Sequence, residues 1–250
     1  RDVGQALLER TTSRGYSNGI RCSTLDQLLA RGDLQRESEN WSHALRFYQA
    51  AVEQFPHEPL PLLCAGGCLL FLNRPAEAVT FFRQAIALTP QLPEAHINLG
   101  LALLCCNEHP EGLKEFEWRR HAITAPLPPI QELPEITPAL RLDGKTVLIH
   151  SEQGFGDLLQ FTRYLPHLAA VGARIIMTVP QPMTRLLSSL EAVEQVIPHG
   201  EPLPPTDFQL PLLSLALKLL PHLPDIPAPT AYLNVDPALA DRWRFRLSSD

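Results

Sequence analysis

Residues 59–92 read PLPLLCAGGCLLFLNRPAEAVTFFRQAIALTPQL, and residues 93–126 read PEAHINLGLALLCCNEHPEGLKEFEWRRHAITAP. The two stretches are equal in length and align from end to end, and residues 25–58 add a third unit to the alignment. Each unit has a glycine at position 8, a small residue at position 20 and an aromatic residue at position 24. A fixed period of this length indicates stacked supersecondary units, because one unit alone cannot bury its apolar face.

The shared positions predict a pair of antiparallel helices in each unit. Small residues at positions 8 and 20 let the two helices approach closely, and the aromatic ring at position 24 fills the gap against the next pair. A proline at position 32, Pro56 or Pro90, ends the second helix because it has no N–H to donate. This set of residues resembles the tetratricopeptide repeat (TPR) over residues 25–126. The third unit departs from the pattern at Arg119 and Thr124, as a terminal unit can.

The TPR resemblance implies a concave wall formed by the first helix of each pair. The side chains at the wall positions are mostly apolar: Leu60, Leu63, Leu70, Ile97, Asn98 and Leu101. Clamps that bind carboxylate tails use Lys, Arg and Asn there, and only Asn98 fits. An apolar groove buries a helix or an extended apolar segment. We expect this chain or a second copy of it to fill the groove, with a peptide from a separate protein as the alternative.

Composition limits the remaining possibilities. A chain of 250 residues suggests about two domains, and its net charge of −6, with neither half basic, disfavours nucleic acid as a partner. The longest apolar run, Leu62 to Leu72, is too short to span a bilayer, which takes about 20 residues. Five cysteines without framework spacing indicate a reducing compartment and predict a cytoplasmic location. Their spacing and that of the histidines predict no metal site.

The second half is expected to be an α/β domain. Residues 1–24 form a separate N-terminal segment, and residues 127–140 form a proline-rich extended linker. Within residues 141–250, strands are expected at 145–150, 174–179, 193–197 and 208–212. Helices are expected at about 157–170 and 182–190, and a last helix contains Trp243. This order predicts a parallel, Rossmann-like sheet, so the fold class is α plus α/β.

The segment after the first strand is the expected ligand site, because open α/β sheets bind ligands beyond the carboxyl ends of their strands. Gly154 and Gly156 let the backbone come near a ligand. Leu159 stands where a dinucleotide fingerprint needs a third glycine, and no P-loop sequence occurs. We therefore expect no cofactor bound by either motif.

The stretch from Leu142 to Leu190 is similar to the first catalytic-half domain of bacterial TPR-linked glycosyltransferases. That family is related to heptosyltransferases and, more distantly, to O-GlcNAc transferase. The matching residues are His150, Glu152, Gln153, Gly154, Gly156, Asp157, Gln160, Phe161, Arg163, Tyr164 and Pro166. The resemblance implies a two-domain GT-B fold whose second half binds a nucleotide-sugar donor. We expect this chain to comprise the repeats and the acceptor-side half, truncated before the donor half and inactive alone.

The resemblance also suggests roles for single residues. Asp157 is implied as the general base for the incoming hydroxyl, and the alternative is that it caps the following helix. His150 either binds the acceptor, serves as the base, or packs in a hydrogen-bonded position. Glu152 and Gln153 support the loop or bind ligand.

The helix that follows supplies three further candidates. Gln160 and Tyr164, one helical turn apart, are expected to share a face. Arg163 lies on a neighbouring face and either meets a phosphate or is solvated.

Three functions remain open. The first is a truncated TPR-linked glycosyltransferase that moves a sugar from a nucleotide to a protein or glycan acceptor. The second is a non-catalytic TPR scaffold for protein–protein interaction. The third is another α/β binding domain that uses the glycine-flanked loop for an anion.

Overall fold

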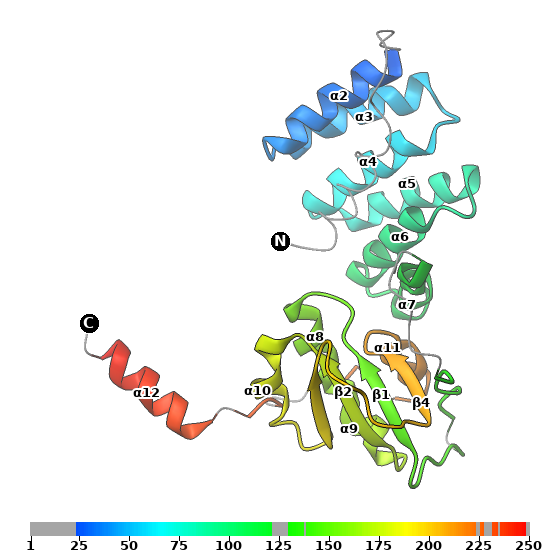
Figure 1. Ribbon diagram of the computed structural model, residues 1–250. Coiled ribbons are helices and arrows are strands. Elements are labelled where there is room, and N and C mark those ends of the chain that lie inside the picture. Colours follow the sequence, from blue (N-terminus) through cyan, green and yellow to red (C-terminus); the bar gives the residue numbers. More distant parts are fainter. Residues whose placement is uncertain are drawn as a thin grey trace. The chain divides into compact units, whose positions relative to one another are not determined.

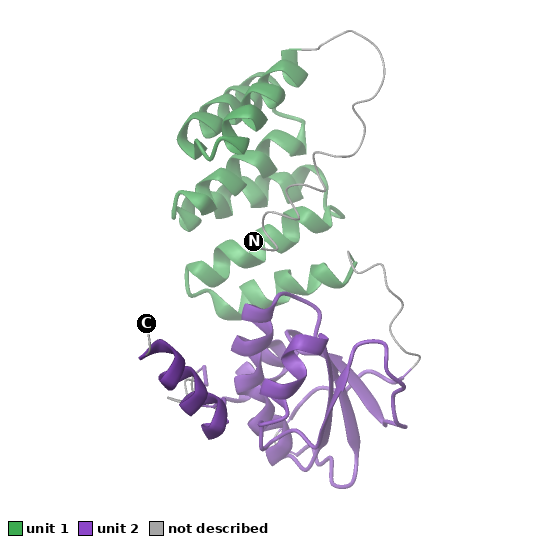
Figure 2. Ribbon diagram, turned by 60° about the vertical axis from the view of Figure 1, so that its left-hand side comes forward, with its two compact units in different colours: residues 1–126 green, residues 127–250 purple. Residues whose placement is uncertain are grey.

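The structure is a computed structural model that describes residues 24–121, 130–137, 139–223, 226–227, 232–234 and 236–248. The chain forms two compact units, residues 1–126 and residues 127–250 (Figure 2). The predicted N-terminal segment, up to residue 23, lies outside the described residues, as do residues 127–129 and 138 of the predicted linker. No helix in the described ranges has the length and apolar composition needed to cross a membrane.

The first unit is a TPR-like array of stacked helix pairs (Figure 1). The first pair is α2 (Thr24–Glu37) with α3 (Trp41–Gln54), and the second is α4 (Pro59–Phe71) with α5 (Pro75–Leu88). The third pair is α6 (Pro93–Cys105) with α7 (His109–Phe116), followed by the 3-10 turn η1 (Glu117–His121). Prolines stand in the first turn of α4, α5, α6 and α7. A backbone N–H at that position has no acceptor within the helix, so its absence in proline costs no hydrogen bond. The helical repeats predicted from the sequence period are confirmed.

The glycine at position 8 is where the two helices of a pair meet. A Cβ on Gly66 would lie 2.5 Å from Cε1 of Phe82, and a Cβ on Gly32 would lie equally near Cε1 of Tyr48. Each ring therefore covers the glycine of its own pair. In the third pair, a Cβ on Gly100 would meet backbone instead, at 2.7 Å from N of Phe116 and 2.8 Å from O of Gly112.

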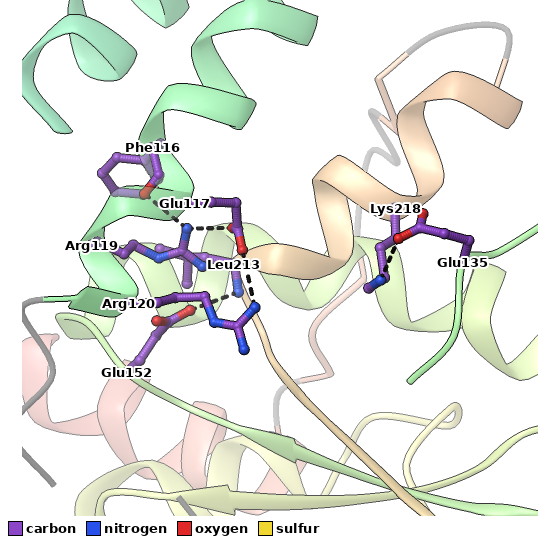
Figure 3. A network of polar contacts seen from close by, with 8 residues as sticks. All are labelled: Phe116, Glu117, Arg119, Arg120, Glu135, Glu152, Leu213 and Lys218. Atoms are coloured by element: carbon purple, nitrogen blue, oxygen red, sulfur yellow. Dashed lines mark hydrogen bonds and ion pairs between the residues drawn. The ribbon is translucent and has the colours of Figure 1, made fainter. Parts of the chain in front are cut away.

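The third unit departs from the repeat pattern because it closes in a different way. Arg119 stands where the other units carry a buried alanine, and it is itself buried, with 3% of its surface exposed. Its Nη1 donates to O of Phe116 at 3.1 Å and to Oε1 of Glu117 at 2.6 Å (Figure 3). The guanidinium also lies over the Phe116 ring, 4.9 Å from its centroid. A buried charge is tolerated when it is paired in this way. Arg119 therefore occupies the buried position that alanine fills in the other two units.

The second unit is built on a four-stranded parallel sheet. Its strands are β1 (Thr146–His150), β2 (Arg174–Val179), β3 (Gln195–Pro198) and β4 (Phe208–Pro211), in the order β3-β2-β1-β4. Every pairing is parallel; Leu148, for example, stands opposite Ile176 of β2 and Gln209 of β4. The parallel sheet predicted from the strand–helix order is confirmed. Its buried residues include Leu148, Ile176 and Ile197 on the three successive strands.

Part of the predicted linker runs along β4, where Glu132 forms an isolated parallel bridge with Gln209. N of Leu133 donates to O of Gln209 at 2.9 Å, and N of Gln209 donates to O of Gln131 at the same distance. Leu133 and Ile136 are buried. Nζ of Lys218 also donates to Oε1 of Glu135 at 2.8 Å (Figure 3). The proline-rich composition suggested an extended spacer. The segment packs on the second unit because it buries the apolar side chains of Leu133 and Ile136.

The helix expected over 157–170 is broken into three pieces. They are α8 (Phe155–Phe161), the 3-10 turn η2 (Thr162–Tyr164) and α9 (Leu165–Ala170). Pro166 explains the break, because it cannot donate to the carbonyl four residues earlier and its ring crowds that carbonyl. The remaining helices are short: η3 (Gln181–Met183), α10 (Thr184–Leu187), α11 (Ser214–Leu219) and η4 (Leu220–His222). The last helix, α12 (Pro237–Leu247), is capped by Asp236 and buries none of its residues.

Candidate functional site

The candidate site lies at the carboxyl edge of the sheet. The chain leaves β1 at His150 and runs through residues 151–154 into α8. β1 pairs with β2 on one side and with β4 on the other, so the strand order reverses between β1 and β4. Open α/β sheets bind their ligands beside such a reversal. The segment from His150 to Gly154 therefore stands at the edge where such sheets bind ligands.

Glu152 bridges the two loops at this reversal. Its Oε1 accepts a hydrogen bond from N of Leu213, which follows β4, at 3.3 Å (Figure 3). N of Leu212 donates to O of His150 at 2.9 Å just below it. The carboxylate of Glu152 thus holds the loop after β1 against the loop after β4.

Ser151 ties the same loop to the other side of the sheet. Its N donates to O of Thr178 on β2 at 3.0 Å, and its Oγ lies 3.0 Å from Nε2 of His199. His199 follows β3, and its N donates to O of Val179 at 2.9 Å. Sequence reasoning missed both Ser151 and His199. The signal was available, because His199 follows a predicted strand whose carboxyl end shares an edge with that of β1.

Asp157 is the third residue of α8, and the N-cap of that helix is Gly154. The N-cap position of α8 is therefore held by Gly154, three residues before Asp157. Its Oδ2 lies 3.9 Å from the position that a Cβ on Gly154 would take, so the carboxylate turns back toward the loop. An acidic residue in the first turn is favourable there, since the free N–H groups carry partial positive charge.

Open space surrounds the two glycines of the loop. Among the residues that the structure describes, a Cβ on Gly156 would meet nothing within 4 Å, and one on Gly154 would meet only Asp157. Both glycines are exposed, and Phe155 between them has 49% of its surface exposed. Gln153 and His150 are half-buried. No close backbone approach within this unit demands glycine at these two positions.

Gln160 and Tyr164 differ in burial. The helix break at η2 leaves Gln160 exposed and turns Tyr164 into the interior, where burial raises the pKa of its hydroxyl.

Arg163 holds a distant segment of the chain. Its Nη1 donates to O of Pro227 at 3.3 Å, and its guanidinium lies 5.5 Å from the ring centroid of Tyr232. The hydroxyl of Tyr232 in turn donates to O of Leu159 at 3.1 Å. Arg163 is thus engaged in packing, and is neither freely solvated nor turned toward the loop.

The wall expected for a TPR groove is mostly covered. Leu63, Ile97 and Asn98 have 4%, 0% and 7% of their surface exposed. Leu60, Leu70 and Leu101 are half-buried, and the first two pack against the core of the array. The six residues therefore do not form an open apolar surface.

Two other features are separate from this site. A cavity of about 280 Å³ is lined by Thr162, Leu165, Pro166, Leu190, Glu191, Ala192, Tyr232 and Asn234, none of which belongs to the loop after β1. Within the described ranges, no group of three or more His, Cys, Asp or Glu side chains could hold a metal ion. Burial raises the pKa of both Cys64 and Cys68, that of Cys68 to about 12, so these thiols are packed groups rather than ready metal ligands.

No family model matches the chain, and no curated protein matches it significantly. Solved structures give partial likenesses. The first TPR domain of human RPAP3 is 19% identical, with a TM-score of 0.37, over 38% of this chain and 75% of that domain. The TPR2B domain of yeast Sti1, solved as a complex with pHsp70, is 18% identical, with a TM-score of 0.38, over 39% and 78%.

A bacterial structure gives a similar result. The Yersinia enterocolitica type III secretion chaperone SycD, bound to a peptide of the translocator YopD, is 20% identical, with a TM-score of 0.39. The match covers 43% of this chain and 82% of SycD. At these identities and TM-scores we infer nothing about ligands from the likenesses.

Proposed function

We propose that the second unit is the acceptor-side half of a GT-B glycosyltransferase and that the array binds acceptor or partner protein. The observation that carries the proposal is the place of the segment His150–Asp157. It leaves β1 at the carboxyl edge, beside the reversal between β1 and β4. Half-buried His150 and Asp157 supply groups that can accept a proton there. The resemblance of this segment to bacterial TPR-linked glycosyltransferases adds the reaction class.

In the proposed reaction, a hydroxyl oxygen of the acceptor forms a bond to the anomeric carbon of the donor sugar. The bond from that carbon to the phosphate oxygen breaks, and the nucleotide leaves with the electron pair. Asp157, or His150, accepts the hydroxyl proton as general base. No step requires a metal or a cofactor. The GT-B arrangement places the nucleotide-sugar on a second Rossmann-like half, so we expect this unit to bind acceptor sugars more tightly than nucleotide-sugars.

A titration followed by amide NMR tests this proposal. The probes are glucose, rhamnose and N-acetylglucosamine on one side, and uridine, guanosine and adenosine diphosphate sugars on the other. We expect a free sugar to shift the amides of residues 151–157 and 212–213. Asp157→Asn should weaken this binding by about tenfold, because a hydrogen bond to a charged group is replaced by a neutral one.

Asp143→Asn is the matched control, since Asp143 lies in the turn before β1, at the opposite end of that strand. It should leave the affinity unchanged. Absence of shifts at the loop with every sugar would overturn the proposal. Sub-micromolar binding of a nucleotide-sugar would show that the donor site is on this chain.

The second candidate is a protein-binding array without catalysis. It is favoured by an aromatic pair on the array: the rings of Trp41 and Phe71 stack at 3.9 Å, and Phe71 is 46% exposed. Such a pair offers an apolar platform to a peptide. Selection from a displayed peptide library tests it. Binders that Phe71→Ser abolishes would support the scaffold, and a failure to select any binder would count against it.

A further inference from the structure

We propose that His199 is a positioning residue for the candidate site and acts through Ser151. The inference rests on the proposed function, since it concerns the loop that carries Asp157. His199 lies 48 residues from Ser151 in the chain, yet its Nε2 is 3.0 Å from Oγ of Ser151. This hydrogen bond reaches from the end of β1 across the end of β2 to the residue that follows β3.

The loop is anchored on both flanks. On the β4 side, Glu152 accepts from N of Leu213. On the β2 and β3 side, Ser151 donates to O of Thr178 through its N and meets His199 through its Oγ. His199 is itself fixed by its N, which donates to O of Val179. Two consecutive residues, Ser151 and Glu152, therefore fix the start of the loop from opposite directions, and its later residues include Asp157.

The hydrogen bond between Ser151 and His199 can form with either a neutral or a protonated imidazole. A hydroxyl can donate to a neutral imidazole nitrogen or accept from a protonated one, so the hydrogen bond persists in either state. The titratable side chains on the segments that meet His199 are His150 at the end of β1, Glu152 in the loop that follows, and Glu201 on its own turn. The β2 residues that meet it, Thr178 and Val179, carry none.

Amide hydrogen exchange on the whole chain tests the positioning role. His199→Ala should raise the exchange of the amides of residues 151–156 by about threefold to tenfold, since one neutral hydrogen bond is lost. His199→Gln should restore most of the protection, because its amide can still bond to Ser151. His222→Ala, an exposed histidine at the end of η4, is the matched control and should change nothing.

The sugar titration gives the second readout. His199→Ala should weaken sugar binding, and His199→Gln should retain it with an unchanged melting temperature. Unchanged exchange in His199→Ala, or faster exchange with unchanged sugar affinity, would overturn the positioning role. Absence of sugar binding by the unaltered protein would instead overturn the proposed function, and the exchange of the loop would still show whether His199 holds it.

Discussion

Three residues at the same repeat position take the left-handed backbone conformation. They are Glu39, Asn73 and Asn107, with φ of 57°, 56° and 63°, and each stands one full repeat after the one before it. The residue after each one donates back to a carbonyl five residues earlier, as in Arg74 N to O of Leu69 at 2.9 Å. This is the Schellman arrangement, in which glycine or asparagine is preferred. The first turn places a glutamate in a conformation that suits asparagine better.

Replacing Glu39 should therefore stabilise the array. Glu39→Asn is expected to raise the free energy of unfolding by about 0.5–1 kcal/mol, because asparagine tolerates the left-handed region. Urea denaturation followed by circular dichroism measures the change. Glu37→Asn, at the last residue of α2, is the control and should bring no gain. A loss of stability in Glu39→Asn would contradict the explanation.

Asp207 gives the sheet a dependence on pH. The hydrogen bond from Nζ of Lys145, followed by that from N of Thr146, lowers the pKa of its carboxyl below the ordinary value. A lowered pKa in the folded state stabilises the fold above the ordinary pKa, and this stabilisation is lost as the pH falls through the folded value. Asp207→Asn should thus be less stable than the unaltered protein at neutral pH. The two urea midpoints should converge as the pH falls through the lowered pKa of Asp207, and a difference that stays constant on acidification would contradict the prediction.

At the scale of elements, the contact of a helix pair depends on what faces its glycine. Gly66→Ala should destabilise the array by about 1–2 kcal/mol, since crowding of the Phe82 ring outweighs the better helix propensity of alanine. Gly100→Ala should cost more, because backbone of α7 cannot turn aside as a ring can. The shifts of the urea midpoints measure both changes, provided that the slope of the unfolding free energy against urea concentration is unchanged.

A double variant separates crowding from other causes. Phe82→Leu combined with Gly66→Ala should cost less than the sum of the two single changes, because the shorter side chain makes room for the new methyl group. A coupling of at least about 0.5 kcal/mol is expected for residues in contact. Strict additivity would show that the ring is not what the added methyl group meets.

The elements could be predicted from the sequence where a period or a strand pattern was strong. The threefold repeat over residues 25–126 predicted the helix pairs, and apolar runs such as residues 174–179 predicted the strands. The helix over 157–170 could not be predicted as one element because Pro166 interrupts it. The place of residues 130–137 was missed for a different reason, since proline content masked two buried apolar side chains, Leu133 and Ile136.

The candidate site could be predicted in part. Parallel topology was enough to bring His150 through Asp157 to the carboxyl edge of the sheet. The partners of that loop, His199 and Leu213, follow strands far along the chain, as their separations of 48 and 61 residues from Ser151 and Glu152 show. A single sequence gives the order of strands along the chain, but not which loops bond across the edge.

At the scale of the molecule, two units with separate cores should fold separately. Tyr48, Phe82 and Leu69 lie in the core of the array, and Leu148, Ile176 and Ile197 lie in that of the sheet. We expect residues 1–126 and residues 127–250, made as separate chains, each to unfold cooperatively in urea. Calorimetry of the two pieces and of the whole chain provides the measurement. A piece that shows no cooperative transition would mean that its core is not sufficient.

The close approach of Gly100 and Gly112 limits which substitutions this protein can accept during evolution. A Cβ on Gly112 would lie 3.1 Å from O of Gly100, and one on Gly100 would lie 2.8 Å from O of Gly112. Every single-nucleotide change in a glycine codon that alters the amino acid adds at least a Cβ. Any single-nucleotide substitution at either codon therefore places a Cβ against this backbone. At Gly156 the described residues leave room for a Cβ, so packing against them does not restrict substitution there.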